Sequence, residues 1–145
     1  MSEGLSWGQR RRSAIRLEPV PTAPRAARQF AARALHGIAQ AALAADVTVV
    51  VSELVTNAIR HTRAPIHLTV QTSIDGVRLE VYDGSPRLPD LPVPGLHAEG
   101  GRGLAIVSSL ADAWGADPIP GDGKIVWAEL RRRRHTELQG PLHAS

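Results

Sequence analysis

The chain has 145 residues, a hydrophobic fraction of 43% and a net charge of +3, which is enough apolar content for one domain with its own core. It contains no cysteine, which excludes disulfides, thiol nucleophiles and thiolate metal sites. No stretch approaches the roughly 18 apolar residues of a membrane span, and no signal-peptide pattern opens the chain. We therefore expect a cytoplasmic protein that does not bind a membrane.

Arginine runs lie near both chain ends. Residues 10–12 and 131–134 are all arginine. Such runs can bind nucleic acid, but no aromatic residues interleave with these and the middle of the chain is not basic. We therefore expect no direct nucleic-acid binding and predict disordered tails at residues 1–12 and 133–145, with one folded domain over residues 13–132.

The first half of the chain predicts one strand and two helices. Residues 13–18 alternate and predict a short strand that ends before Pro19. Residues 24–40 place apolar side chains at helical spacing, with Thr22 as the N-cap. Residues 44–61 are rich in valine, which favours strands, but their apolar residues recur every three or four positions. We therefore predict a helix there.

The second half predicts a hairpin, a third helix and two more strands. Residues 66–72 and 77–82 alternate on either side of Asp75-Gly76, a strong hairpin signal. Residues 85–99 contain four prolines and predict a long lid loop without regular structure. Residues 101–114 predict the third helix, and strands are expected near 116–119 and 125–130.

Three polar residues lie along the otherwise apolar helix at 44–61. Glu53, Asn57 and His61 are spaced four apart, so each lies about 40° further round the helix and the three form one polar edge. A carboxylate and a carboxamide on one edge suit a hard, oxygen-preferring cation, or a general base beside a phosphate. An ordinary solvated face is the alternative explanation of this pair.

Two further clusters have the chemistry of a nucleotide site. Asp83 follows a hydrophobic strand, where its carboxylate can accept a hydrogen bond from an exocyclic amine such as that of adenine, although Asp83-Gly84 also reads as a simple turn. Gly101, Arg102 and Gly103 open the third helix. Glycine lets the backbone approach a ligand, helix N-terminal amides bind phosphate oxygens, and an arginine adds a charged donor.

Together these clusters resemble a known family. Glu53-Leu-Val-Thr-Asn57-Ala-Ile-Arg-His61, then Asp83, then Gly101-Arg-Gly-Leu104 resemble the N, G1 and G2 boxes of the GHKL ATPases, the group that includes gyrase, histidine kinases and MutL. The stretches GGRGLAIVSSLADAWG and GKIVWAEL are most similar to the stand-alone anti-sigma-factor serine kinases. The resemblance covers roughly residues 14–132. It implies the Bergerat ATP-binding fold, an α+β two-layer sandwich with a mixed, mostly antiparallel sheet and helices on one face.

The resemblance also implies roles and cofactors. Asn57 would hold Mg²⁺, Glu53 would be the general base and Asp83 would read the adenine amino group. The ATP phosphates would be surrounded by Gly101, Arg102, Gly103 and Leu104. His61 either lines the far end of this ATP site or faces the helix dipole as a C-terminal histidine. ATP and Mg²⁺ are therefore the expected cofactors.

Two positions depart from the family pattern. The first glycine box usually reads Asp-x-Gly-x-Gly, whereas this chain has Asp83-Gly84-Ser85-Pro86-Arg87, which predicts a stiffer loop. Where the family often has a threonine near the adenine, this chain has Lys124 followed by Ile125. Lys124 is predicted either to reach an ATP phosphate or only to occupy a turn. Both departures predict a lower affinity for ATP.

The function predicted by resemblance is a serine/threonine protein kinase that is also an anti-sigma factor. It would bind a sigma factor and phosphorylate a STAS-type antagonist protein, whose interface the added charge would break. The presence of Glu53 supports catalysis. The alternative is an ATP-dependent interaction module without useful transfer activity, which the altered glycine box favours. A histidine-kinase catalytic domain is disfavoured because no phospho-acceptor helix pair is found. A homodimer is expected by resemblance.

Overall fold

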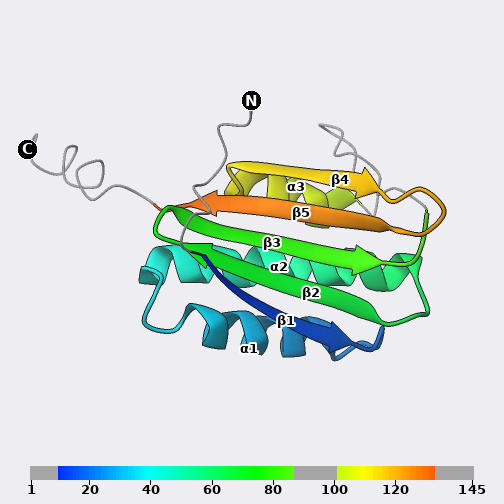
Figure 1. Ribbon diagram of the computed structural model, residues 1–145, viewed down its shortest axis with the longest axis horizontal. Coiled ribbons are helices and arrows are strands. Elements are labelled where there is room, and N and C mark those ends of the chain that lie inside the picture. Colours follow the sequence, from blue (N-terminus) through cyan, green and yellow to red (C-terminus); the bar gives the residue numbers. More distant parts are fainter. Residues whose placement is uncertain (1–9, 87–100, 133–145) are drawn as a thin grey trace, which may run out of the picture.

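A computed structural model describes residues 10–86 and 101–132 (Figure 1). In these residues five strands form one sheet in the order β1-β2-β3-β5-β4, and every neighbouring pair is antiparallel. The helices lie on one face of this sheet (Figure 1). The predicted α+β two-layer sandwich is therefore confirmed, and its sheet is antiparallel throughout the described residues rather than mixed.

Strand β1 (Arg11–Leu17) begins two residues earlier than predicted. Arg11 and Arg12 pair with Thr72 and Gln71 of β2, so the sheet extends into the stretch that was expected to be a disordered tail. These arginines do not alternate with apolar residues, and an edge strand tolerates charged side chains. Residues 1–9 and 133–145, the rest of the predicted tails, lie outside the described residues.

Helix α1 (Ala23–Leu35) ends five residues before the predicted position 40. His36 leaves the helical conformation with ψ of 126°, and Gly37 follows with φ of 74°, a left-handed conformation that glycine adopts readily. Ile38, which falls within the helix predicted over residues 24–40, is therefore outside the observed helix and 43% exposed. The buried face of α1 consists of Ala23, Ala27, Ala31 and Leu35.

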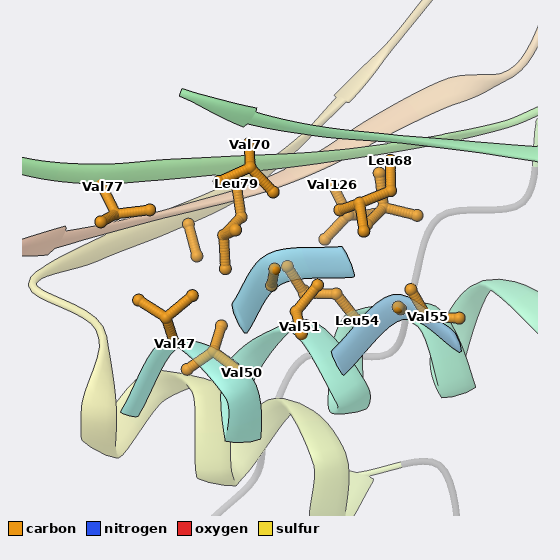
Figure 2. Close-up of a cluster of buried hydrophobic side chains, with 14 of the residues drawn as sticks. Val47, Val50, Val51, Leu54, Val55, Leu68, Val70, Val77, Leu79 and Val126 are labelled. Atoms are coloured by element: carbon orange, nitrogen blue, oxygen red, sulfur yellow. The ribbon is translucent and has the colours of Figure 1, made fainter. Parts of the chain in front are cut away.

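Helix α2 (Ala41–His61) confirms the helix predicted from the valine-rich period. Its apolar stripe faces the side chains of the sheet and forms the centre of the core (Figure 2). From the helix this core includes Val47, Val50, Val51, Leu54 and Val55, and from the sheet Leu68, Val70, Val77, Leu79 and Val126. The need to bury this stripe outweighs the strand propensity of valine.

In the described part of the chain, α2 is also the helix that is long and apolar enough, by length and composition, to cross a membrane. No membrane span is predicted from the sequence, because no stretch approaches roughly 18 consecutive apolar residues. A buried core helix meets the same criteria, and the apolar stripe of α2 is packed against the sheet.

The remaining strands complete the sheet and bring the end of β3 next to the start of β5. Strands β2 (Ile66–Ser73) and β3 (Gly76–Asp83) form the predicted hairpin. Strand β5 (Lys124–Arg131) pairs with β3, and β4 (Ala113–Pro118) is the edge strand beyond it. The predicted lid, apart from Ser85 and Pro86, lies outside the described residues.

Helix α3 (Gly101–Leu110) ends before the predicted position 114. The prediction placed Trp114 in the helix, whereas it lies in β4 opposite Ala128. The chain joins the sheet at Asp112, whose amide donates to the carbonyl of Glu129 at 2.9 Å and whose carboxylate accepts from the amide of Arg131 at 2.6 Å. Neither glycine nor proline marks this helix end in the sequence, which explains the error.

Candidate functional site

The end of β3, the start of β5 and the C-terminal end of α2 lie at the same end of the molecule (Figure 1). Asp83 is the last residue of β3 and Lys124 the first residue of β5, and the two are direct partners in the strand pairing. Side chains alternate along a strand, so Asp83 follows Leu79 and Val81 onto the helix-covered face of the sheet. The sheet thus directs the carboxylate of Asp83 and the ammonium group of Lys124 toward the helix layer.

Asp83 is held through one of its two carboxylate oxygens. Its Oδ1 accepts hydrogen bonds from the Ser85 amide at 2.9 Å and from Lys124 Nζ at 3.0 Å. Its Oδ2 is buried and has no partner among the described residues. A buried acceptor left without a donor costs about 1–3 kcal/mol. Oδ2 is therefore the atom that a ligand amine at this position would satisfy.

Lys124 lies on Asp83 in this structure. The Asp83 and Lys124 side chains are both 0% exposed and form a salt bridge, and Lys124 Nζ also lies 3.4 Å from the carbonyl oxygen of Ser85. The sequence predicts either a phosphate contact or a turn position for this residue, and does not predict its pairing with Asp83. No local signal indicates it, since the two residues are 41 positions apart.

Glycine 123 allows the start of β5 to close on the end of β3. A Cβ added at Gly123 would overlap the carbonyl oxygen of Asp83 and lie 2.6 Å from Gly84 Cα. Only a residue without a side chain fits this approach. Sequence reasoning did not identify Gly123 as part of the site.

Glu53 on α2 lies against the first turn of α3. A Cβ added at Gly103 would lie 2.9 Å from Glu53 Oε1, so the glycine leaves room for this carboxylate. Gly101 and Arg102 are the first two residues of the same helix, and Leu104 is fully buried beneath it. The structure therefore brings the predicted base next to the glycine-rich helix start.

Asn57 lies one helical turn beyond Glu53 and is only 7% exposed. Its Nδ2 is buried and has no hydrogen-bond partner in the described ranges 10–86 and 101–132. A buried carboxamide can offer its oxygen to a cation or its N–H to a phosphate oxygen. His61 is the last residue of α2 and is partly buried.

No group of three or more histidines or acids in the described residues is arranged to hold a metal ion. A cation at Asn57 would therefore take most of its ligands from a bound phosphate chain and from water, as Mg²⁺ commonly does. The residues present fit Mg²⁺ only as a companion of a nucleotide.

Tyr82 fixes the loop that precedes β5. Its hydroxyl donates a hydrogen bond to Asp122 Oδ1 at 2.5 Å. This hydrogen bond raises the pKa of Tyr82, with a smaller contribution from burial. The contact ties the end of β3 to the β4–β5 turn and so supports the neighbouring Asp83–Lys124 pair.

A cavity of about 550 Å³ lies at the other end of the sheet. Its walls include Ile38 and Leu43 beside the start of α2, the β2–β3 turn residue Ile74, and Arg11 and Arg132. None of the predicted site residues lines it. The predicted site residues lie instead toward the Asp83 end, where Asn57, Asp83 and Lys124 are buried.

Three features of this structure are together typical of a nucleotide-binding domain of the GHKL type. They are an antiparallel sheet with helices on one face, an acid at the end of a strand, and a glycine-rich helix start beside a glutamate. The family model of the histidine kinase-like ATPase domain matches residues 15–129, which include every predicted site residue. The chain therefore belongs to the histidine kinase-like ATPase domain family, whose members bind ATP. Comparison with curated proteins gave no match.

Proposed function

We propose that this protein is an ATP-dependent regulator of transcription: an anti-sigma factor that phosphorylates a serine or threonine of a STAS-type antagonist. The observation that carries the nucleotide assignment is Asp83 Oδ2, a fully buried acceptor without a partner in the described residues at the end of β3. The adenine amino group is a donor of the required kind. The family match over residues 15–129 supports the same assignment.

The proposed catalysis uses the contact between α2 and α3. Bound ATP supplies the phosphoryl group, and backbone amides at the start of α3 would bind its phosphate oxygens. Glu53 lies beside Gly103 in the first turn of that helix. Its carboxylate would accept the proton of the antagonist hydroxyl as that oxygen attacks the γ-phosphorus of ATP, while the bond from that phosphorus to the β–γ bridging oxygen breaks and ADP leaves. Asn57 would be the side chain that holds Mg²⁺, which would supply positive charge to stabilise the phosphates.

A second candidate function is an ATP-dependent binding module without useful transfer activity. The Asp83–Lys124 salt bridge favours it, because Lys124 occupies one carboxylate oxygen at the position expected to read the base. Such a module would bind its protein partners in a nucleotide-dependent way and leave the antagonist unmodified.

Calorimetric titration of ATP and ADP, with and without Mg²⁺, tests the nucleotide assignment. We expect binding to the wild type and a loss of roughly 10- to 100-fold in affinity for Asp83→Asn, because one buried acceptor contact is removed. Asp75→Asn, at the opposite end of β3, is the matched control and should bind like the wild type. Absence of binding at millimolar nucleotide would refute the proposal.

Transfer to a protein distinguishes the two candidate functions. Radiolabelled ATP and a candidate antagonist should give a phosphorylated antagonist with the wild type and at least about 100-fold slower labelling with Glu53→Gln, which removes the base. Glu18→Gln, exposed next to β1, serves as the control. If ATP binds and no labelling occurs with any tested antagonist, the binding module is the better description.

A further inference from the structure

Within residues 10–86 and 101–132, the buried Asp83–Lys124 pair leaves one carboxylate oxygen without a donor and one ammonium N–H without an acceptor. Asp83 Oδ1 is occupied by Ser85 and Lys124, whereas Oδ2 has no partner among the described residues. An ammonium group has three N–H donors. Those of Lys124 meet Asp83 Oδ1 at 3.0 Å and the Ser85 carbonyl at 3.4 Å, which leaves one without an acceptor in the described part of the chain.

The two main classes of purine differ at this kind of contact. Adenine presents a donor at its C6 amino group, whereas guanine and hypoxanthine present an acceptor at the C6 keto oxygen. A carboxylate alone accepts from the amine and repels the keto oxygen. That is how a single buried acid selects adenine.

A carboxylate paired with an ammonium group does not select adenine over guanine and hypoxanthine in this way. The free N–H of Lys124 can donate to a keto oxygen, and Asp83 Oδ2 can accept from the adjacent N1–H of the same 6-oxopurine. Adenine can also bind both groups, because its amine can donate to Asp83 Oδ2 and its N1 can accept from the ammonium group of Lys124. The charge of the pair is balanced, so the repulsion that excludes a keto oxygen is absent.

We propose that Lys124 is a specificity-determining residue that allows the site to bind 6-oxopurine nucleotides, such as GTP and ITP, as well as ATP. This inference rests on the proposed nucleotide-binding function and extends it to the class of base. Both side chains are 0% exposed, so entry of either base requires this end of the sheet to open locally.

Competitive titration of ATP, GTP and ITP on the full chain tests the proposal. In the wild type the Kd values of GTP and ITP should lie within about tenfold of that of ATP. Lys124→Thr removes the ammonium donor and should raise the GTP-to-ATP and ITP-to-ATP ratios of Kd roughly 10- to 100-fold, the effect of one buried contact left unsatisfied. Lys124→Arg retains the cation and should keep the ratios within about fivefold of the wild type.

The outcomes separate this inference from the function on which it rests. ATP binding with GTP and ITP more than about 100-fold weaker overturns the role of Lys124 and leaves the nucleotide assignment intact. Ratios that Lys124→Thr leaves unchanged overturn it as well. If none of the three nucleotides binds, both proposals fail. Should Lys124→Thr not fold, the wild-type ratios decide alone.

Discussion

A fully buried ion pair such as Asp83–Lys124 is a weak source of stability by itself. Removing two charges from water costs several kcal/mol per ion, and their mutual attraction offsets this cost only when the remaining hydrogen-bonding positions are filled. Here Asp83 Oδ2 has no partner among the described residues. With one oxygen unpartnered among the described residues, the pair adds little to stability, which supports the ligand recognition proposed above.

We expect the two residues to be strongly coupled in stability. Lys124→Met or Asp83→Leu alone leaves a buried charge without its partner and should lower the free energy of unfolding by about 3–5 kcal/mol. The double variant has apolar side chains at both positions and should unfold within about 1–2 kcal/mol of the wild type. Urea denaturation of the four proteins gives the coupling energy. Additive losses in the double variant would show that the two charges do not depend on each other.

The contact between Gly103 and Glu53 allows activity and stability to be separated. Gly103→Ala places a Cβ 2.9 Å from Glu53 Oε1, the end of a flexible side chain that can move aside. Alanine in a helix is more favourable than glycine by up to about 1 kcal/mol. We therefore expect stability to be kept or increased while antagonist phosphorylation falls at least about tenfold, because a displaced base loses its geometry. Unchanged kinase activity at equal stability would argue against Glu53 as the base.

Tyr82 makes stability depend on pH in the alkaline range. Its hydrogen bond to Asp122 raises the pKa of the phenol in the folded protein. The folded protein then holds this proton at a pH where the unfolded chain has lost it, so the contribution is complete below the ordinary tyrosine pKa and is lost as pH rises through the folded pKa. Urea midpoints should fall more steeply above about pH 10 in the wild type than in Tyr82→Phe. Parallel profiles would mean that the hydrogen bond is not maintained in solution.

Single residues of the site differed in how well sequence reasoning could place them. The proximity of Glu53 to Gly103 agrees with a site that joins the two motifs, and Asp83 lies at the strand end where an acceptor was predicted. The partner of Lys124 could not be predicted, because it depends on the register between β3 and β5, which are separated by α3 and β4. The alternation of apolar residues decides which face of the sheet each side chain occupies, but without a connecting hairpin turn it does not decide which residues of β3 and β5 stand opposite each other.

Helix α2 contributes residues both to the hydrophobic core and to the candidate site. Its valine stripe is buried against the sheet, and Glu53 and Asn57 occupy the adjoining edge. The stripe fixes the rotation of the helix about its axis, so the polar edge cannot turn away from α3. Packing in the core therefore positions the residues of the site.

Two adjacent valines of α2 test this arrangement. Val50 is 0% exposed and Val49 is 41% exposed. Val50→Ala should lower the free energy of unfolding by about 2 kcal/mol through lost burial and a residual cavity. Val49→Ala should change it by no more than about 0.5 kcal/mol, since alanine also has the higher helix propensity. Chemical denaturation of both variants gives the comparison, and equal losses would contradict the observed face of the helix.

The elements that sequence patterns predicted best are those whose period is governed by one buried face. The predicted ends of α1 and α3 were wrong, because apolar residues can continue at helical spacing beyond the last residue of a helix. In α3 the spacing of Leu104, Val107 and Leu110 continues to Trp114, which is also partly buried but lies in β4. Hydrogen bonds of Asp112 to β5 decide this boundary, and they form only once the sheet is assembled.

The candidate site is formed by residues of four elements that are distant from one another in the sequence. Glu53 and Asn57 come from α2, Asp83 from β3, Gly103 from α3 and Lys124 from β5. None of these elements can form its part of the site alone, because each depends on the common core for its position. A ligand bound here therefore contacts only the assembled domain and should stabilise it as a unit.

We expect ATP to raise the free energy of unfolding by an amount set by its Kd. A ligand that binds only the folded protein adds RT ln(1 + [L]/Kd), about 2.7 kcal/mol at a concentration of 100 Kd. Urea denaturation with ATP at that multiple, using the Kd from calorimetry, should show this increment in the wild type. Val50→Ala should gain the same increment from its lower starting stability, because its site residues are unchanged. Asp83→Asn, which we expect to bind ATP roughly 10- to 100-fold more weakly, should gain only about 0.4–1.4 kcal/mol at the same ATP concentration. An increment in Asp83→Asn equal to that of the wild type would place the nucleotide away from the end of β3.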